Sequence, residues 1–176
     1  MRIILVGFGV VGRSIAEVIL EKTNLLVKNY GISPKVVAIV DSQGCALDPR
    51  GLDLKQALVV KKDSGSISHM PDIGIPRMTA TEVIENTDSE IMIDVVPTNT
   101  KTGEPGLTHI KTALRTGKHV VTANKGPLAL ALPSLTELAF YNRVQLRFGG
   151  AVGAGTPILE FAKKCLLGSE ILSAKG

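Results

Sequence analysis

The opening stretch decides the fold, and it reads MRIILVGFGVVG (residues 1–12). A short β-branched run ends at Gly7, and apolar residues recur at helical spacing after Gly12. A strand that enters a helix through GxGxxG is the context in which this pattern binds a dinucleotide. The glycines would allow a tight turn, approach of a diphosphate to the backbone at Gly9, and close packing of helix on strand. A merely flexible turn is the alternative. The expected cofactor contacts of this turn are Gly7, Phe8, Gly9, Val10, Val11 and Gly12.

A second compact run of valine and isoleucine ends at Asp41. A carboxylate at the end of the second strand can accept hydrogen bonds from ribose hydroxyls and would repel a 2′-phosphate. An ordinary turn-forming aspartate is the alternative interpretation. Ser42 and Gln43 provide no adjacent cation, so NAD is favoured over NADP. Arg50 or Lys55 could still approach from the loop that follows.

The rest of the chain alternates between runs typical of helices and of strands. We expect helices over residues 52–60, 81–86, 106–116, 128–141 and 158–167, and strands over 90–96, 119–123 and 144–148. The pattern weakens over residues 44–77, of which residues 63–76 are rich in Ser, Gly and Pro, so we expect a long surface excursion there. Thr156 before Pro157 predicts a capped start for the last helix. Alternation of this kind favours an α/β fold, a Rossmann-type doubly wound domain with a mainly parallel sheet.

Composition limits the class of protein. The 176 residues suit one domain, and 44% hydrophobic with only 3% aromatic residues indicates an aliphatic core. The formal charge is +4, but the basic residues form no stripe and no aromatics lie between them, so no nucleic-acid partner is expected. Two distant cysteines without CxxC spacing indicate neither a disulfide framework nor a zinc site. The lack of a disulfide framework favours a reducing, cytoplasmic location. The apolar start is too short to span a bilayer, so we expect no membrane partner.

Two polar segments follow strands on the side where open α/β sheets bind ligands. Thr98 follows the strand expected over residues 90–96 and could line the nicotinamide side, with a simple turn as an equal alternative. Asn124 and Lys125 follow the strand expected over residues 119–123. A lysine in a surface loop is usually only a solvated charge, so position alone assigns it no role.

The chain resembles homoserine dehydrogenases in several segments. They are VGFGVVG (6–12), GEPGLTHIKTAL (103–114), GKHVVTANKGPLAL (117–130) and AVGAGTPI (151–158). They occur in the right order over nearly the whole chain, and TANKGPL is much more specific than GxGxxG. The resemblance implies reversible oxidation of L-homoserine to L-aspartate 4-semialdehyde. Hydride would pass between this small-molecule substrate and nicotinamide C4 of NAD, with NADP possible.

The resemblance also implies roles for individual residues. Lys125 would be the catalytic residue, beside the nicotinamide and the substrate, where its ammonium could polarise the carbonyl or join a proton relay. The family's glycine-rich turn presents main-chain carbonyls to an alkali metal ion. Carried over by position, the ligands would be Gly149, Val152, Ala154 and Thr156. The family usually has Glu at the first of these positions, so an ordinary glycine-rich connection remains an equal alternative.

A domain organisation follows from the same resemblance. Residues 1–150 would form the dinucleotide-binding domain, and residues 151–176 would begin a substrate and dimerisation region. In the family that region continues with a second catalytic lysine and acidic substrate ligands, and the full-length enzyme is usually a homodimer. We therefore expect a truncated chain that binds NAD but turns over poorly.

Two other functions stay open, and the histidines are assigned no role. The chain could belong to a related dehydrogenase of another amino-acid-derived substrate, or it could be a dinucleotide-binding module without catalysis. The three histidines do not cluster in the sequence and are interpreted as ordinary surface or strand-edge residues. They are His69, His109 and His119.

Overall fold

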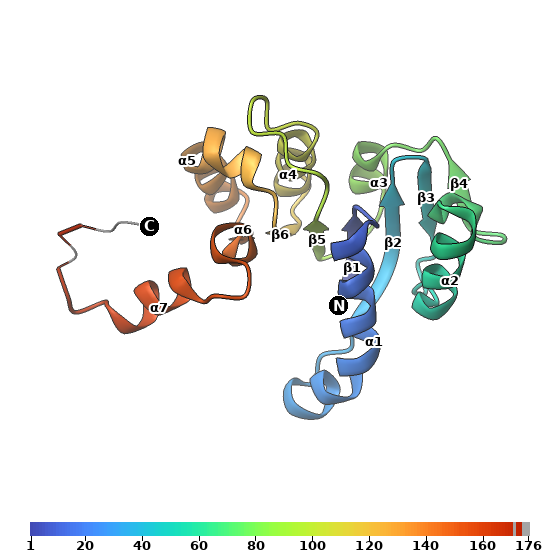
Figure 1. Ribbon diagram of the computed structural model, residues 1–176, viewed down its shortest axis with the longest axis horizontal. Coiled ribbons are helices and arrows are strands. Elements are labelled where there is room, and N and C mark those ends of the chain that lie inside the picture. Colours follow the sequence, from blue (N-terminus) through green and yellow to red (C-terminus); the bar gives the residue numbers. More distant parts are fainter. Residues whose placement is uncertain (171, 174–176) are drawn as a thin grey trace.

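The computed structural model describes residues 1–170, 172 and 173, and it contains a seven-stranded sheet (Figure 1). The strands are β1 (Arg2–Val6), β2 (Lys35–Asp41), β3 (Gly44–Leu47), β4 (Gly74–Pro76), β5 (Ile91–Asp94), β6 (His119–Thr122) and β7 (Leu146–Arg147). The helices are α1 (Val10–Tyr30), α2 (Leu54–Ser64), α3 (Ala80–Asn86), α4 (Gly106–Arg115), α5 (Lys125–Tyr141), α6 (Gly149–Gly153) and α7 (Ile158–Cys165), with a 3-10 turn η1 (Ile67–His69).

The strand order is β4-β3-β2-β1-β5-β6-β7. Strand β1 pairs in parallel with β2 on one side and with β5 on the other, and β6 and β7 continue in parallel. Strands β2 to β4 are therefore added on one side of β1 and strands β5 to β7 on the other. Open α/β sheets bind ligands at such a reversal of strand order. The predicted Rossmann-type, mainly parallel fold is confirmed.

Both faces of the sheet are covered, because side chains of a strand point alternately to opposite faces. In β1, Ile3 and Leu5 pack with residues of α1, α2 and η1, whereas Ile4 and Val6 pack with residues of α3, α4 and α5. Ile4 and Leu5 are fully buried, and each such side chain contributes about 1.5–3 kcal/mol. Burial on both faces explains why the strands read as continuous apolar runs.

The segment between β2 and α3 differs from the prediction. Two short strands lie in the region expected to be a surface excursion: β3 pairs antiparallel with β2, and β4 pairs antiparallel with β3. The expected helix is present as α2, whose first turn is capped by the Asp53 carboxylate, an acceptor for the N–H groups of Lys55 and Gln56. This antiparallel extension completes the side of the sheet beside β2.

The C-terminal third also departs from several expectations. Helix α5 begins at Lys125, three residues before the predicted start, because Asn124 caps it by accepting from Gly126 N–H. It is kinked at Ala131, two residues before Pro133, whose missing N–H and bulky ring disturb the preceding turn. Strand β7 has two residues instead of the five predicted.

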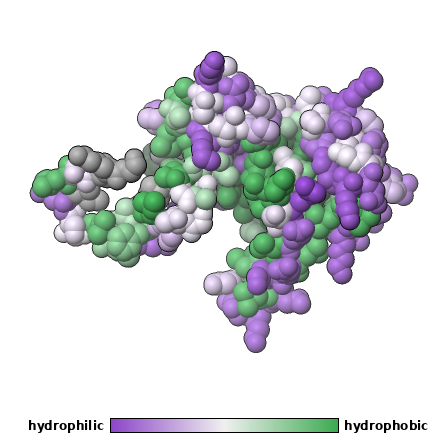
Figure 2. All heavy atoms as spheres, in the orientation of Figure 1, coloured by the Kyte–Doolittle hydropathy of each residue, from purple (hydrophilic) through white to green (hydrophobic). Residues whose placement is uncertain are grey.

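The glycine-rich segment is partly helical, since α6 occupies its first half. The predicted Thr156 cap is wrong: Pro157 is the N-cap of α7, and no side chain caps this helix by a hydrogen bond. Figure 1 shows α7 lying apart from the sheet, and Figure 2 shows apolar surface over this segment. Ile158 and Phe161 of α7 are more than half exposed. Among the described helices, none combines the length and apolar character needed to cross a membrane.

Candidate functional site

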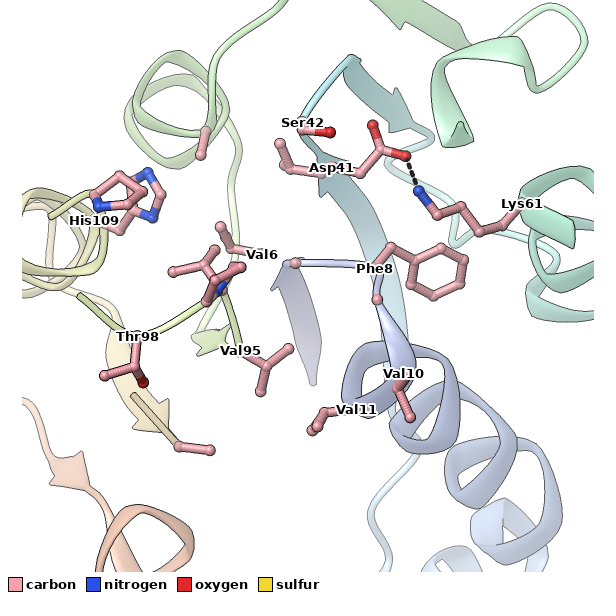
Figure 3. Close-up of a pocket in the computed structure, with 18 residues that line it drawn as sticks. Val6, Phe8, Val10, Val11, Asp41, Ser42, Lys61, Val95, Thr98 and His109 are labelled. Atoms are coloured by element: carbon pink, nitrogen blue, oxygen red, sulfur yellow. Dashed lines mark hydrogen bonds and ion pairs between the residues drawn. The ribbon is translucent and has the colours of Figure 1, made fainter. Parts of the chain in front are cut away.

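A cavity of about 680 Å³ lies where the carboxyl ends of β1, β2 and β5 meet. Figure 3 shows Asp41 and Lys61 on one side of it and His109 and Thr98 on the other. The lining consists of Val6, Gly7, Phe8, Gly9, Val10, Val11, Val40, Asp41, Ser42, Lys61, Ala80, Val95, Val96, Pro97, Thr98, Pro105, His109 and Ala123. The cavity therefore lies beside β1, at the point where the strand order reverses.

The glycine turn between β1 and α1 is held tightly at two positions and open at a third. Gly7 has a φ of +100°, and a Cβ there would lie 2.8 Å from the carbonyl carbon of Val95. A Cβ on Gly12 would lie 2.0 Å from the carbonyl oxygen of Gly7, so only glycine lets the helix pack this closely. A Cβ on Gly9 would meet nothing within 4 Å. The turn thus leaves space for a ligand at Gly9, where the backbone can be approached directly.

The N-terminus of α1 faces this space without a competing anion. Gly9 is the N-cap, no side chain caps the helix, and the first turn carries no acidic residue. The first N–H groups of a helix have no partner within it and carry a partial positive charge. Val10 and Val11, which are 73% and 52% exposed, add apolar surface at the edge of the cavity. The arrangement suits an anionic group attached to an apolar body.

Asp41 accepts four hydrogen bonds at the end of β2. Its Oδ2 accepts from Lys61 Nζ at 2.7 Å and from Ile67 N–H at 2.9 Å. Its Oδ1 accepts from Gln43 N–H at 2.9 Å and from the Ser66 hydroxyl at 3.1 Å. Burial acts to raise the pKa of Asp41, but the Lys61 bond and the main-chain donors outweigh it and hold the pKa below its ordinary value. The carboxylate is therefore ionised, and its ordinary acceptor positions are occupied.

Lys61 is the cation beside Asp41 that the sequence did not reveal. It lies in the last turn of α2, 20 residues after Asp41, and its side chain is 18% exposed. Arg50 instead forms an ion pair with Asp48 at 3.0 Å, and neither Arg50 nor Lys55 lines the cavity. The basic end of the predicted helix was the available signal, but only the tertiary structure places it against Asp41.

The other predicted cofactor residues divide into two groups. Thr98 lines the cavity, as do all residues of the glycine turn except Gly12, which packs behind it. Asn124 is buried, and Lys125 is exposed at the first position of α5; neither lines the cavity. Lys125 is joined to the cavity wall through its N–H, which lies 3.4 Å from Thr98 Oγ1. Within the described residues, its ammonium makes no hydrogen bond or ion pair.

The interpretation of His109 as an ordinary surface or strand-edge residue is wrong. It lies on α4, is 7% exposed and lines the cavity. Its Nδ1 lies 3.6 Å from Oδ1 of Asp94, a fully buried carboxylate. His119 fits the strand-edge interpretation, since its Nδ1 accepts from Gln145 N–H at 3.0 Å. His69 lies in η1 and is exposed.

The four residues expected to hold an alkali ion are only partly brought together. Gly149, Ala154 and Thr156 line a hollow of about 260 Å³, whereas Val152 is not part of its lining and is 53% exposed. The Thr156 carbonyl accepts from Ile158 N–H at 2.9 Å. Over residues 1–170, 172 and 173, no group of three His, Cys, Asp or Glu side chains could hold a metal ion. The ion site therefore stays a prediction.

Comparison with known proteins identifies the fold's relatives. The family model for the NAD-binding domain of homoserine dehydrogenase matches residues 7–148. The chain belongs to the homoserine dehydrogenase family. The matched segment runs from the glycine turn to just past the end of β7.

Members of the homoserine dehydrogenase family match this chain over most or all of its length. The homoserine dehydrogenase of Methanocaldococcus jannaschii is 46% identical over 100% of this chain and 52% of its own length. The NAD(+)-dependent homoserine dehydrogenase of Pseudomonas canavaninivorans is 34% identical over 99% of this chain and 50% of its own length. A solved hyperthermophilic archaeal homoserine dehydrogenase in complex with NADPH is 32% identical, with a TM-score of 0.79 over 91% of this chain and 47% of its own. The chain spans about half the length of the curated relatives it matches.

Proposed function

We propose that this chain is the cofactor-binding part of a homoserine dehydrogenase and holds NAD or NADP with the diphosphate at the N-terminus of α1. The observation that carries the proposal is the open space at Gly9 in front of an uncapped helix with no acidic residue in its first turn. The bound nicotinamide supplies the hydride chemistry. The chain's own residues bind the cofactor, orient it and exclude water.

Lys125 is the residue of this chain that we assign to the reacting end. It stands at the carboxyl end of β6, next to Thr98, and its ammonium has no partner among the described residues. An ammonium there can donate a hydrogen bond to the oxygen of L-homoserine or of L-aspartate 4-semialdehyde, the substrate pair that the family's name implies. In this proposal, residues 1–150 form the dinucleotide-binding domain and residues 151–176 begin the substrate region.

The Asp41–Lys61 pair sets the choice between NAD and NADP in our proposal. Relatives of both kinds exist, one named NAD(+)-dependent and one solved with NADPH. The ammonium of Lys61 favours the 2′-phosphate of NADP, whereas the ionised carboxylate of Asp41 repels it. The four acceptor positions of Asp41 are already occupied, so a ribose hydroxyl of NAD would have to displace one of its donors to bond it. We therefore propose that both cofactors bind and that NAD binds more tightly.

Calorimetric titration of the chain with NADH, NADPH and ADP-ribose tests this function. ADP-ribose carries the diphosphate without the nicotinamide, so it reports the helix site alone. A Gly9→Val change should weaken all three by at least about tenfold, since its side chain fills the space that the diphosphate needs, while the thermal unfolding temperature stays close to that of the wild type. Failure of the wild-type chain to bind ADP-ribose, NADH and NADPH would overturn the proposal.

The alkali ion stays a prediction with its own test. Three of its expected residues, Gly149, Ala154 and Thr156, line one hollow, and oxygen ligands suit a hard cation. If the ion binds there, replacing sodium chloride by an equal concentration of tetramethylammonium chloride should destabilise the segment around α6 locally and speed the hydrogen exchange of its amides. Hydrogen exchange of the amides of residues 149–156 measures this effect, and identical exchange in the two salts contradicts the site.

A further inference from the structure

A buried carboxylate lies directly behind the loop that carries Lys125. Asp94 is the last residue of β5, and its register partner on the neighbouring strand is Thr122, the last residue of β6. Asp94 is fully buried and Thr122 is 2% exposed. The Thr122 hydroxyl donates to Asp94 Oδ2 at 3.0 Å, and Ala123 N–H donates to the Asp94 carbonyl at 3.2 Å. Both bonds tie the end of β6 to β5.

The same hydroxyl continues the connection toward Lys125. Asn124 N–H donates to Thr122 Oγ1 at 2.9 Å, and the Asn124 side chain accepts from Gly126 N–H at 3.3 Å. The backbone on both sides of Lys125 is thus fixed, by Asn124 before it and by Gly126 after it. The direct contact of Lys125 N–H with Thr98 Oγ1 is longer, at 3.4 Å. The place where Lys125 leaves the sheet depends mainly on the bonds that start at Asp94.

Close packing leaves Asn124 little freedom. A Cβ on Gly106, the first residue of α4, would lie 2.3 Å from Asn124 Nδ2, and a Cβ on Gly126 would lie 2.2 Å from the Asn99 carbonyl oxygen. Two neighbouring segments therefore press on the turn before α5. A shift of Asn124 would have to move α4 as well. The position of the Thr122 hydroxyl therefore fixes the position of the Lys125 backbone through Asn124.

This arrangement lowers the free energy of unfolding. A buried carboxylate loses its hydration, and the nearest cationic candidate, His109 Nδ1, lies 3.6 Å from Asp94 Oδ1. Asp94 Oδ1, His109 Nδ1 and Asn124 Nδ2 make no hydrogen bond with any described residue. Apolar residues of similar size would fill this part of the core at no such cost. Asp94 and Thr122 are therefore better explained by a role in positioning the backbone at this edge of the sheet.

We propose that Asp94 and Thr122 are positioning residues that fix Lys125 beside the cavity, next to the place where the nicotinamide would lie. A hydrogen bond to a charged acceptor is short and directional, so the carboxylate orients the Thr122 hydroxyl and, through it, Asn124 N–H. The inference rests on the proposed function, in which Lys125 stands beside the nicotinamide. It assigns to these two residues no contact with the cofactor or the substrate.

The test compares NADH with ADP-ribose, because only NADH carries the nicotinamide that Lys125 would contact. The ratio of the two dissociation constants is measured by calorimetry for Thr122→Val, Thr122→Ser, Lys125→Ala and the double variant Thr122→Val/Lys125→Ala. Thr136→Val is the matched control, since this exposed α5 threonine bonds only the Leu132 carbonyl of its own helix, at 2.8 Å. Thermal unfolding of each variant shows that it is folded.

We expect the Thr122→Val change to lower NADH affinity relative to ADP-ribose, and to do so by displacing Lys125. Lys125→Ala should weaken NADH by about tenfold relative to ADP-ribose, as for a hydrogen bond to a charged group, and Thr122→Val should have a similar effect. Thr122→Ser keeps the hydroxyl and should restore the ratio, and the double variant should be no worse than Lys125→Ala alone, because coupled residues are not additive.

Two outcomes overturn the inference. The first is an unchanged ratio in Thr122→Val or in Lys125→Ala, which includes an equal loss of NADH and ADP-ribose affinity. The second is a Thr122→Val effect that persists at full size in the Lys125→Ala background. If the wild-type chain binds neither ligand, the proposed function fails and this inference fails with it; binding of ADP-ribose without any of the coupled losses removes the inference alone.

Discussion

Lys61 Nζ donates to Asp41 Oδ2 across 2.7 Å at the edge of the cofactor cavity (Figure 3). The two side chains come from α2 and from the end of β2, and both are largely buried. An anion and a cation thus share the place where the two nicotinamide dinucleotides would differ. In the proposed function, the choice between NAD and NADP depends on how the ribose or its 2′-phosphate interacts with this ion pair.

Changes to the pair should shift cofactor preference in opposite directions. Asp41→Asn removes the charge that repels a 2′-phosphate, so NADPH should gain affinity relative to NADH by about tenfold. Lys61→Ala removes the cation that would pair with the phosphate, so NADPH should lose at least about tenfold relative to NADH. Parallel calorimetric titrations measure both ratios.

The neighbouring Lys62 provides the control for that measurement. It lies in the same last turn of α2 and is exposed. Lys62→Ala removes the same charge from the chain, but it should leave the NADPH to NADH ratio within about twofold, because exposed charges are screened. Equal effects of Lys61→Ala and Lys62→Ala would show that the ion pair plays no part in selectivity.

Acid should destabilise the chain through Asp41. The pKa of this carboxyl is lowered in the folded chain, so its contribution to stability is present above the unfolded value of about 3.9 and is lost as pH falls through the folded value. The unfolding temperature of the wild type should therefore exceed that of Asp41→Asn at pH 7, and the difference should shrink below about pH 4. Melting curves followed by circular dichroism between pH 7 and pH 3 give both values. A constant difference over this range contradicts the role of the charge.

Substitutions of Gly12 and Gly9 should differ in their effect on the free energy of unfolding. A methyl group on Gly12 would collide with the Gly7 carbonyl oxygen, at 2.0 Å, so Gly12→Ala should cost about 1–3 kcal/mol of unfolding free energy. A methyl group on Gly9 meets nothing within 4 Å, so Gly9→Ala should change stability by less than about 0.5 kcal/mol. Urea denaturation distinguishes the two. Equal losses would mean that the helix does not pack on the strand as described.

The two cysteines should react at very different rates. Burial, with the charges of Asp41 and Glu82, raises the pKa of the Cys45 thiol to about 11, whereas Cys165 on α7 is exposed. Because the thiolate is the reactive form, a disulfide reagent at pH 8 should modify one thiol quickly and the second only after denaturation. Cys165→Ser should abolish the fast phase and Cys45→Ala should leave it intact. A fast phase that survives in Cys165→Ser would contradict the burial of Cys45.

Local signals made much of the fold predictable. The strand before Gly7, the helix after it and the carboxylate at the end of β2 follow from residue order, because periodicity and glycine placement act over short distances. Strands β3 and β4 were missed because four and three residues carry no periodicity. Strand β3 pairs with the adjacent β2, whereas the partner of β4 lies far back in the chain.

The side chains around the cavity were less predictable. Lys61 and His109 reach it only through the packing of α2 and α4 on the sheet, which the sequence does not display. The start of α5 was placed too late because Gly126 and Pro127 are turn formers. A proline in the first turn of a helix costs no hydrogen bond, since its N–H would be unpaired there. Lys125 is therefore a helix residue and not part of a loop.

Both outer strands of the sheet are stubs, and this limits how copies of the chain can associate. Strand β4 has three residues and ends in Pro76, which has no N–H to donate, and β7 has two residues. An incoming strand would find too few amide groups for a ladder, so edge-to-edge aggregation is discouraged. Exposed apolar side chains on helices, such as Ile158 and Phe161 of α7, offer a larger surface for association than these strand edges do.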